Sequence, residues 1–328
     1  MSTFSASTER SGLRNSDVRS RRARYAAVAL SALLIATLGS CATRPTRVDP
    51  IEIPDPLPDA IARFAKPGGW AVETQTGAMV SQHGCTVEYV VYRSVGVDLS
   101  EYPGGRPLVV LAHGFLRSLE SMRGWAEHWA SWGVDTVAVT FCNSTPFSGN
   151  HDRNADDLVA VAAQLAPGST PVVYAGFSAG GLSALLAADA DRRATAYLGL
   201  DAVDSGGQSE RVVRLRMPAL YLFAEPGSCN ADANMARAMP ASSPLLALRI
   251  PFTTHCDFEH PTDRGCERFC GRIEPEDAQA AIAETVRSLA TAWIVMQAGA
   301  DPAARMTFAP DARADLERRR RIVTLHAD

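Results

Sequence analysis

Short apolar runs recur through the middle of the chain and are separated by stretches with a helical pattern. The runs are rich in β-branched or aromatic residues, which is typical of strands buried on both faces of a parallel sheet. The predicted strands are Leu108–Ala112, Thr136–Phe141, Val172–Ala175, Ala196–Leu200, Ala219–Phe223 and Leu245–Ile250. This alternation predicts an α/β domain with a mostly parallel central sheet and helices on both faces.

The stretches between these runs favour helices, and a hairpin precedes them. Ser118–Trp132 and Pro275–Met296 space their apolar residues as helices do, and the second would close the domain. Asn154 precedes acidic residues and the apolar stretch Leu158–Leu165, which is typical of a helix N-terminus. Apolar and polar residues alternate between positions 69 and 94, which predicts a hairpin at an antiparallel edge of the sheet.

The beginning of the chain has the composition of a targeting segment. Arginines precede an uncharged apolar stretch that ends in Leu38-Gly39-Ser40-Cys41, a tetrapeptide that resembles the bacterial lipobox. We therefore expect residues 1–40 to be a lipoprotein signal peptide and Cys41 to be the lipidated first residue of the mature chain. A plain cleaved signal or an uncleaved anchor is the alternative. In either case we expect an exported domain at the cell membrane, facing the periplasm or the cell exterior.

Composition divides the rest of the chain into three parts. Prolines among polar residues predict an extended linker over residues 41–68. Residues 69–300 then form the folded domain, and residues 301–328 an Arg-rich C-terminal tail. We expect the arginines at 318–321 to lie on a solvent-exposed helix face, with contact to phospholipid headgroups as the alternative.

Net charge argues against a nucleic-acid partner. The whole chain has a formal net charge of −4, and loss of residues 1–40 would remove more arginines than acidic residues. The mature domain would therefore be more acidic still, whereas binding to a phosphate backbone requires basic surface.

Export also decides how the cysteines are interpreted. Six of the seven cysteines follow Cys41, and an even number in an oxidising compartment predicts disulfides. A metal site is the alternative, because six residues with ligand-capable side chains lie in one stretch. They are His255, Cys256, Asp257, His260, Cys266 and Cys270. This stretch has no Cys-x-x-Cys pair, so we expect no metal.

The third apolar run leads directly into a Gly-x-Ser-x-Gly turn, in which Gly176 and Gly180 flank Ser178, and a helical stretch follows. This geometry lifts a serine hydroxyl clear of the backbone, and only small residues fit where strand and helix come closest. The helix start also leaves the N–H of Ala179 free beside the position of a tetrahedral oxyanion. An ordinary glycine-rich turn is the alternative, but the flanking strand and helix favour a nucleophilic serine.

The order of these elements resembles the α/β-hydrolase fold over roughly residues 70–298. The first apolar run ends in His113-Gly114-Phe115, where that fold places its second oxyanion donor. The resemblance therefore implies an oxyanion hole formed by the N–H groups of Phe115 and Ala179. It also implies a structural role for His113, with a catalytic role as the alternative.

A candidate general base follows the last predicted strand. Histidine side chains titrate near neutral pH, so a histidine can accept the serine proton and return it to a leaving group. We predict that His255 is this base, with His260 as the alternative. The sequence His-x-Asp-Phe that begins at His255 resembles the chlorophyllase and platelet-activating-factor acetylhydrolase branches, which are related to dienelactone hydrolases.

The acid of the triad has more than one candidate. In most α/β-hydrolases it follows the strand that corresponds here to Ala219–Phe223, and this chain has Glu225 there, followed by proline and glycine. Asp201 ends the preceding strand, and the two branches named above have their acid at that position. We therefore predict that Asp201 is the acid. Glu225 is the first alternative and Asp204 the second.

The resemblance implies a serine hydrolase that cleaves carboxylic esters through a covalent acyl-enzyme, without a metal or organic cofactor. The substrate would be a small-molecule or lipid-like ester. Two alternatives remain open: an acyltransferase that uses the same triad, because acceptor choice depends on pocket shape, and a binding lipoprotein without catalysis.

Overall fold

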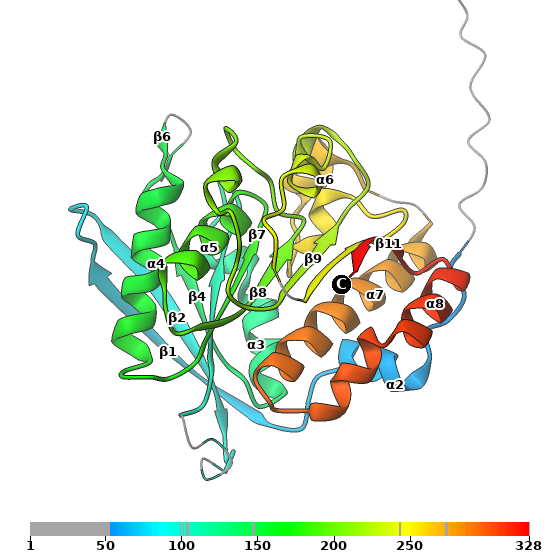
Figure 1. Cartoon of the computed structure of the whole chain (residues 1–328), viewed down its shortest axis with the longest axis horizontal. Coiled ribbons are helices and arrows are strands. Elements are labelled where there is room, and N and C mark those ends of the chain that lie inside the picture. The colour runs from blue at the N-terminus through cyan, green and yellow to red at the C-terminus, as the bar shows by residue number, and fades with distance from the viewer. Residues whose placement is uncertain are drawn as a thin grey trace, which may run out of the picture. The chain divides into compact units, whose positions relative to one another are not determined.

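A nine-stranded sheet forms the centre of the domain in the computed structural model (Figure 1). The structure describes residues 53–98, 100, 102, 105–145, 148–242, 244–272 and 275–327, so the expected signal peptide and Cys41 lie outside it. In spatial order the strands are β1 (Ala71–Val80), β2 (Thr86–Val95), β4 (Asp135–Thr140), β3 (Leu108–Ala112), β7 (Val172–Phe177), β8 (Ala194–Leu200), β9 (Ala219–Phe223), β10 (Leu245–Arg249) and β11 (Val323–Ala327).

The six predicted strands form the parallel part of this sheet, from β4 through β10. Their bounds differ from the prediction by at most two residues. The predicted hairpin is β1 and β2, and β2 pairs antiparallel with β4. The prediction of a mostly parallel α/β sheet is therefore confirmed.

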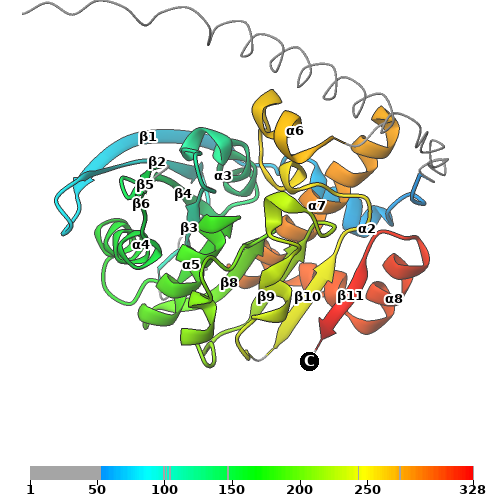
Figure 2. The same cartoon turned by 90° about the horizontal axis from the view of Figure 1, so that it is seen from above.

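Each parallel strand contributes side chains to two separate apolar cores, one on each face. In β3, Leu108, Val110 and Ala112 pack in one core, whereas Val109 and Leu111 pack in the other. Helices α4 (His151–Leu165) and α5 (Ala179–Ala190) cover the first face, and α3 (Arg123–Ser131) and α7 (Glu276–Gln297) cover the second (Figure 2). Burial on both faces explains why the strands are continuous apolar runs.

Shorter elements connect these layers. The remaining helix on the strand-end side is α6 (Arg264–Cys270), and β5 (Ser144–Thr145) pairs with β6 (Ser148–Gly149). Single 3₁₀ turns are η3 (Leu119–Ser121), η4 (Gln208–Arg211), η5 (Ser228–Asn230), η6 (Asn234–Arg237) and η7 (His255–Phe258). Helix α4 begins earlier than predicted, because the Asn150 side chain accepts a hydrogen bond from the Arg153 N–H and caps it.

The end of the expected linker belongs to the domain. Helix α2 (Asp59–Ala62) and turn η1 (Arg63–Ala65) contact α7, and Leu57, Ile61 and Phe64 are buried in the same core as that helix. The three apolar residues are spaced by four and three positions, which places them on one face of a helical turn. The predicted domain start at residue 69 is therefore too late.

The expected C-terminal tail is also part of the domain. Residues 302–327 form η8 (Pro302–Phe308), α8 (Pro310–Arg318) and β11, which pairs antiparallel with β10. The Arg318 side chain is exposed, as expected, but Arg321 is 3% exposed. Its guanidinium donates to the carbonyl of Asp55 at 2.6 Å and to the carbonyl of Ala281 at 2.6 Å. Arg321 therefore joins the two ends of the domain through α7 and is not a headgroup-binding side chain.

The six cysteines after Cys41 form disulfides, as predicted. The pairs are Cys85–Cys142, Cys229–Cys270 and Cys256–Cys266. Pairing leaves Cys256, Cys266 and Cys270 without thiolates, so they cannot ligate a metal as the alternative interpretation required. Three disulfides indicate an oxidising, exported environment. Among the described residues, no helix is long and apolar enough to cross a membrane.

Candidate active site

Ser178 occupies a sharp turn between β7 and α5. Its φ of 55° lies in the left-handed region, which is costly for a residue with a side chain. The turn is possible because glycines stand on either side. A Cβ on Gly176 would collide with the carbonyl oxygen of Gly180, and a Cβ on Gly180 with that of His113. The sequence motif is therefore a geometric requirement of this turn.

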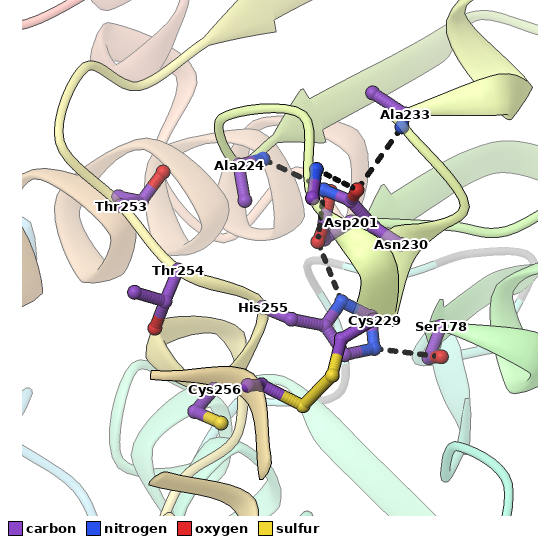
Figure 3. Close-up of polar contacts among 12 residues, drawn as sticks. Ser178, Asp201, Ala224, Cys229, Asn230, Ala233, Thr253, Thr254, His255 and Cys256 are labelled. Carbon is purple, nitrogen blue, oxygen red and sulfur yellow. Dashed lines mark hydrogen bonds and ion pairs between the residues drawn. A yellow bond between two sulfur atoms is a disulfide. The ribbon is translucent and has the colours of Figure 1, made fainter. Parts of the chain in front are cut away.

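Three side chains that are far apart in the sequence form one hydrogen-bonded chain (Figure 3). The Nε2 atom of His255 lies 2.8 Å from Ser178 Oγ, and its Nδ1 atom lies 2.6 Å from Asp201 Oδ2. Asp201 Oδ2 accepts the Nδ1 proton, so Nε2 carries the lone pair that faces the serine hydroxyl. Ser178 follows β7, Asp201 follows β8 and His255 follows β10, so all three lie at the carboxyl edge of the sheet.

The Asp201 carboxylate is fully buried and is held by further donors. Oδ1 accepts from the N–H of Ala224 at 2.9 Å, and the Asn230 side-chain amide lies 3.3 and 3.1 Å from the two carboxylate oxygens. The amide orientation is set because Asn230 Oδ1 itself accepts from the N–H groups of Gly227 and Ala233. A buried carboxylate is tolerated only with such hydrogen bonds.

Two disulfides hold the loops that carry these groups. Cys229 precedes Asn230 and is bonded to Cys270, and Cys256 follows His255 and is bonded to Cys266. Cys266 and Cys270 both belong to α6, so this one helix is linked covalently to the turn that holds the acid and to the turn that holds the histidine. Cys229 and His255 line the same cleft.

The alternative residues lie elsewhere. The Glu225 carboxylate pairs with Arg249 at 3.4 Å and accepts from the Phe252 N–H at 3.4 Å, on the loop that leads to His255. Asp204 accepts from the N–H of Ser209. His260 packs edge-on against Trp125, and burial lowers its pKa to about 4, with Arg287 adding to the effect. None of these three is hydrogen-bonded to Ser178 or His255 in the described part of the chain.

The predicted oxyanion donors lie beside Ser178. Phe115 and Ala179 line the same pocket as the serine, and neither N–H donates a hydrogen bond to a described residue. His113 supports this loop: its Nδ1 lies 2.6 Å from the Gly114 carbonyl, and its Nε2 accepts from the Phe141 N–H at 3.0 Å. Both ring nitrogens are therefore used structurally, as expected for a residue that positions the loop.

Two hollows meet at Ser178. A pocket of about 450 Å³ lies on the α4 and α5 side and is lined by His151, Asn154 and Ser183 together with the oxyanion donors. A cleft of about 370 Å³ lies on the α6 side and is lined by Phe177, His255 and Phe269. A bound ester could therefore extend to both sides of the serine hydroxyl.

Sequence reasoning missed several residues of this site. Asn230 lies in the loop after β9, but nothing in the sequence separates an asparagine that orients a carboxylate from one that stabilises a turn. Glu259 is buried beneath the cleft and pairs with Arg117 at 2.6 Å; burial raises the pKa of its carboxyl, and Arg117 opposes that shift. Its only sequence signal is its proximity to His255.

No protein-family model matches this chain, and no curated protein matches it either. The geometry described above is therefore the basis for assigning a function.

The histidine that supports the oxyanion loop makes stability dependent on pH. Burial lowers the pKa of His113 from 6.5 to about 4, although its contact with the Gly114 carbonyl opposes the shift. The neutral ring therefore contributes stability that is complete above pH 6.5 and is lost as the pH falls towards 4. Between about pH 7.5 and about pH 5, we expect His113 to account for about 2 kcal/mol of lost unfolding free energy.

Urea unfolding at these two pH values, in the native protein and in His113→Gln, measures this contribution. Glutamine keeps a donor and an acceptor but does not titrate, so its pH dependence should be shallower by that amount. Equal slopes for the two proteins would show that the pKa of His113 does not fall on folding, which would contradict the prediction.

Proposed function

We propose that this protein is a serine hydrolase of the α/β-hydrolase type that cleaves carboxylic esters. The single observation that carries the proposal is the hydrogen-bonded chain Ser178–His255–Asp201 beside two backbone N–H groups that make no hydrogen bond to a described residue. The strand order supports it, because nucleophile, acid and base follow three parallel strands in the chain order Ser, Asp, His. The serine turn has the strained geometry expected of a nucleophile.

In this proposal the serine attacks the ester carbonyl carbon while His255 Nε2 removes the hydroxyl proton. The oxyanion receives hydrogen bonds from the N–H groups of Phe115 and Ala179. The C–O bond to the alcohol then breaks, and His255 returns the proton to the departing oxygen. Water attacks the acyl-enzyme in the same way, which releases the acid and restores the serine. Asp201 holds the imidazole in the required tautomer throughout.

Hydrolysis is favoured over the two alternatives. A binding protein without catalysis gains nothing from a serine held 2.8 Å from a histidine that is oriented by a buried aspartate. An acyltransferase would have to exclude water from the acyl-enzyme, whereas the exposed Phe115, Leu116 and Phe269 border a cleft that solvent enters. Water is therefore the acceptor that we assign.

Ser178→Ala should abolish both ester cleavage and covalent labelling by a fluorophosphonate probe, with an activity loss of at least about a thousandfold. The far-UV circular dichroism spectrum should not change, because the serine side chain contributes little to packing. Ser169→Ala, in an exposed loop, is the matched control and should label like the native protein. Labelling or ester cleavage that survives in Ser178→Ala would contradict the proposal.

Asp201→Asn should lower kcat by about 10³-fold to 10⁴-fold, because the amide would hold His255 in the wrong tautomer. Glu225→Gln should cost at most about tenfold, since its carboxylate is partly exposed and acts only on the Phe252 backbone and Arg249. Steady-state kinetics on one chromogenic ester compares the two. If Glu225→Gln lowers kcat by orders of magnitude and Asp201→Asn lowers it only slightly, the acid of the triad is Glu225, in the loop after β9.

We also propose that the protein is a lipoprotein anchored through Cys41, on the basis of the arginine-rich start, the apolar stretch and the lipobox-like tetrapeptide. The three disulfides support export. Expression in a bacterial host should place the native protein in the membrane fraction and Cys41→Ser in the soluble exported fraction. An unchanged distribution in Cys41→Ser would argue against a lipid anchor.

A further inference from the structure

The two hollows beside Ser178 differ in the polar groups that they present, and we call them the polar pocket and the apolar cleft. The polar pocket, next to α4 and α5, is lined by apolar side chains that include Phe115, Phe141 and Val203, and by the neutral polar side chains of Ser144, His151, Asn154, Ser183, Ser205 and Gln208. Among the described residues that line it, none is acidic and none is lysine or arginine. The apolar cleft, next to α6, is lined mostly by Phe115, Leu116, Phe177, Phe269 and cysteines of two disulfides, and its charged groups are the paired Arg117 and Glu259.

Asn154 in the polar pocket is unusual because its side-chain oxygen is buried and has no hydrogen-bond partner among the described residues. The residue is 4% exposed, and its Oδ1 makes no hydrogen bond to any described residue. It does not cap α4, because Asn150 does so one turn earlier. A buried amide oxygen without a hydrogen bond is costly, so a ligand that supplies a donor there gains an interaction that an apolar ligand cannot make.

A second acceptor and a neutral ring line the same pocket. Gln208 Oε1 is buried and makes no hydrogen bond among the described residues. His151 Nδ1 lies 3.1 Å from Ser183 Oγ, so this contact engages one of the two ring nitrogens. Burial lowers the pKa of His151, although the backbone of Ala179 opposes this, which favours the neutral ring.

A hydroxyl group fits this set of partners better than a charged group. A carboxylate or an ammonium ion would be buried without an opposite charge, which is strongly unfavourable. A hydroxyl donates one hydrogen bond, so a hydroxyl of the ligand pairs with Asn154 Oδ1 or with Gln208 Oε1 without placing a charge in the pocket. The pocket volume of about 450 Å³ is sufficient for a short substituted acyl chain.

The position of His255 decides which part of an ester occupies which hollow. The departing alcohol oxygen must lie within reach of His255 Nε2 to receive its proton. His255 lines the apolar cleft, whereas Ala179 and Gly180 line the polar pocket. The alcohol part therefore extends into the apolar cleft and the acyl part into the polar pocket.

We propose that the substrates are esters of short hydroxylated acids with apolar alcohols, and that Asn154 and Gln208 determine specificity by binding the hydroxyl of the acyl group. This inference rests on the proposed esterase function and adds the substrate class to it.

Three esters test the inference with the full-length protein. Benzyl β-hydroxybutyrate carries the hydroxyl on the acyl side, benzyl butyrate lacks it, and hydroxypropyl phenylacetate is the isomer with the two sides exchanged. We expect kcat/KM for benzyl β-hydroxybutyrate to exceed that of each of the other two by about tenfold or more, since each comparator leaves buried polar groups unpaired.

Asn154→Leu replaces the amide by an apolar group of similar size and should bring the ratio of kcat/KM for hydroxybutyrate over butyrate close to one. Gln208→Leu, at the wall of the same pocket, should lower the same ratio. This second variant tests the inference if Asn154→Leu does not fold. Gln164→Leu lies on the same helix α4, away from both hollows, and should keep the native ratio. Folding of each variant is checked by circular dichroism.

The outcomes separate this inference from the esterase proposal. Absence of Ser178-dependent cleavage of all three esters and of fluorophosphonate labelling would overturn both. Ser178-dependent cleavage with equal rates for the hydroxylated and plain acyl esters would overturn the substrate class alone. Faster cleavage of the exchanged isomer than of benzyl β-hydroxybutyrate would show that the acyl and alcohol sides are assigned the wrong way round. If Asn154→Leu and Gln208→Leu both keep the native ratio of kcat/KM, these two residues do not determine the preference for the hydroxyl.

Discussion

Burial of the Asp201 carboxylate is the constraint on which the geometry of the site depends. A fully buried carboxylate is unstable unless donors surround it, and each donor here comes from a different segment: His255 from the loop after β10, Ala224 from the end of β9 and Asn230 from η5. Satisfying this one group therefore fixes the relative positions of three loops. The orientation of the His255 ring, and with it the contact to Ser178, follows from the same requirement.

The backbone around the site is strained, and hydrogen bonds from the sheet compensate for this. Ser178 and Asp201 both have positive φ, at 55° and 42°, next to each other at the ends of β7 and β8. The Ser178 N–H donates to the Leu200 carbonyl at 3.0 Å, and the Asp201 N–H donates to the Leu222 carbonyl at 2.7 Å. The parallel ladder thus continues to the strained residues, and these backbone hydrogen bonds hold them at the edge of the sheet.

The loops beyond the sheet have little regular structure and depend on covalent links. Residues 224–272 contain β10 and otherwise only short helical turns and α6. The disulfides Cys229–Cys270 and Cys256–Cys266 join α6 to the turns η5 and η7, and η7 begins with His255. They also line the apolar cleft, so the same bonds that hold the His255 loop in place form one wall of the surface that faces a substrate. On the opposite side, the regular helices α4 and α5 carry His151, Asn154 and Ser183, and the turn η4 carries Gln208.

The sequence alone determined the parallel strands and the main helices of this protein, but not α2, α8 and β11 at the two ends of the domain. Apolar runs with β-branched residues specify strands that are buried on both faces, so all six parallel strands were predictable. Gly176 and Gly180 marked the serine turn, because no larger residue fits at either position. It also favoured Ser178, His255 and Asp201 as the triad, with Glu225 as the alternative acid, since each of these residues ends or follows a strand and carboxyl ends of parallel strands meet at one edge.

Only the tertiary structure decided between Asp201 and Glu225, because both residues follow strands and the choice depends on which carboxylate faces the histidine ring. The pairing of the cysteines, the role of Asn230 and the burial of Arg321 were likewise undecided. Each depends on a partner elsewhere along the chain, from 10 residues away for Cys256–Cys266 to 266 residues away for Arg321 and Asp55, and local pattern carries no information about such contacts. The different polarity of the two hollows has the same origin: residues from separate loops and helices form each wall, and their side chains meet only after the sheet has brought those segments together.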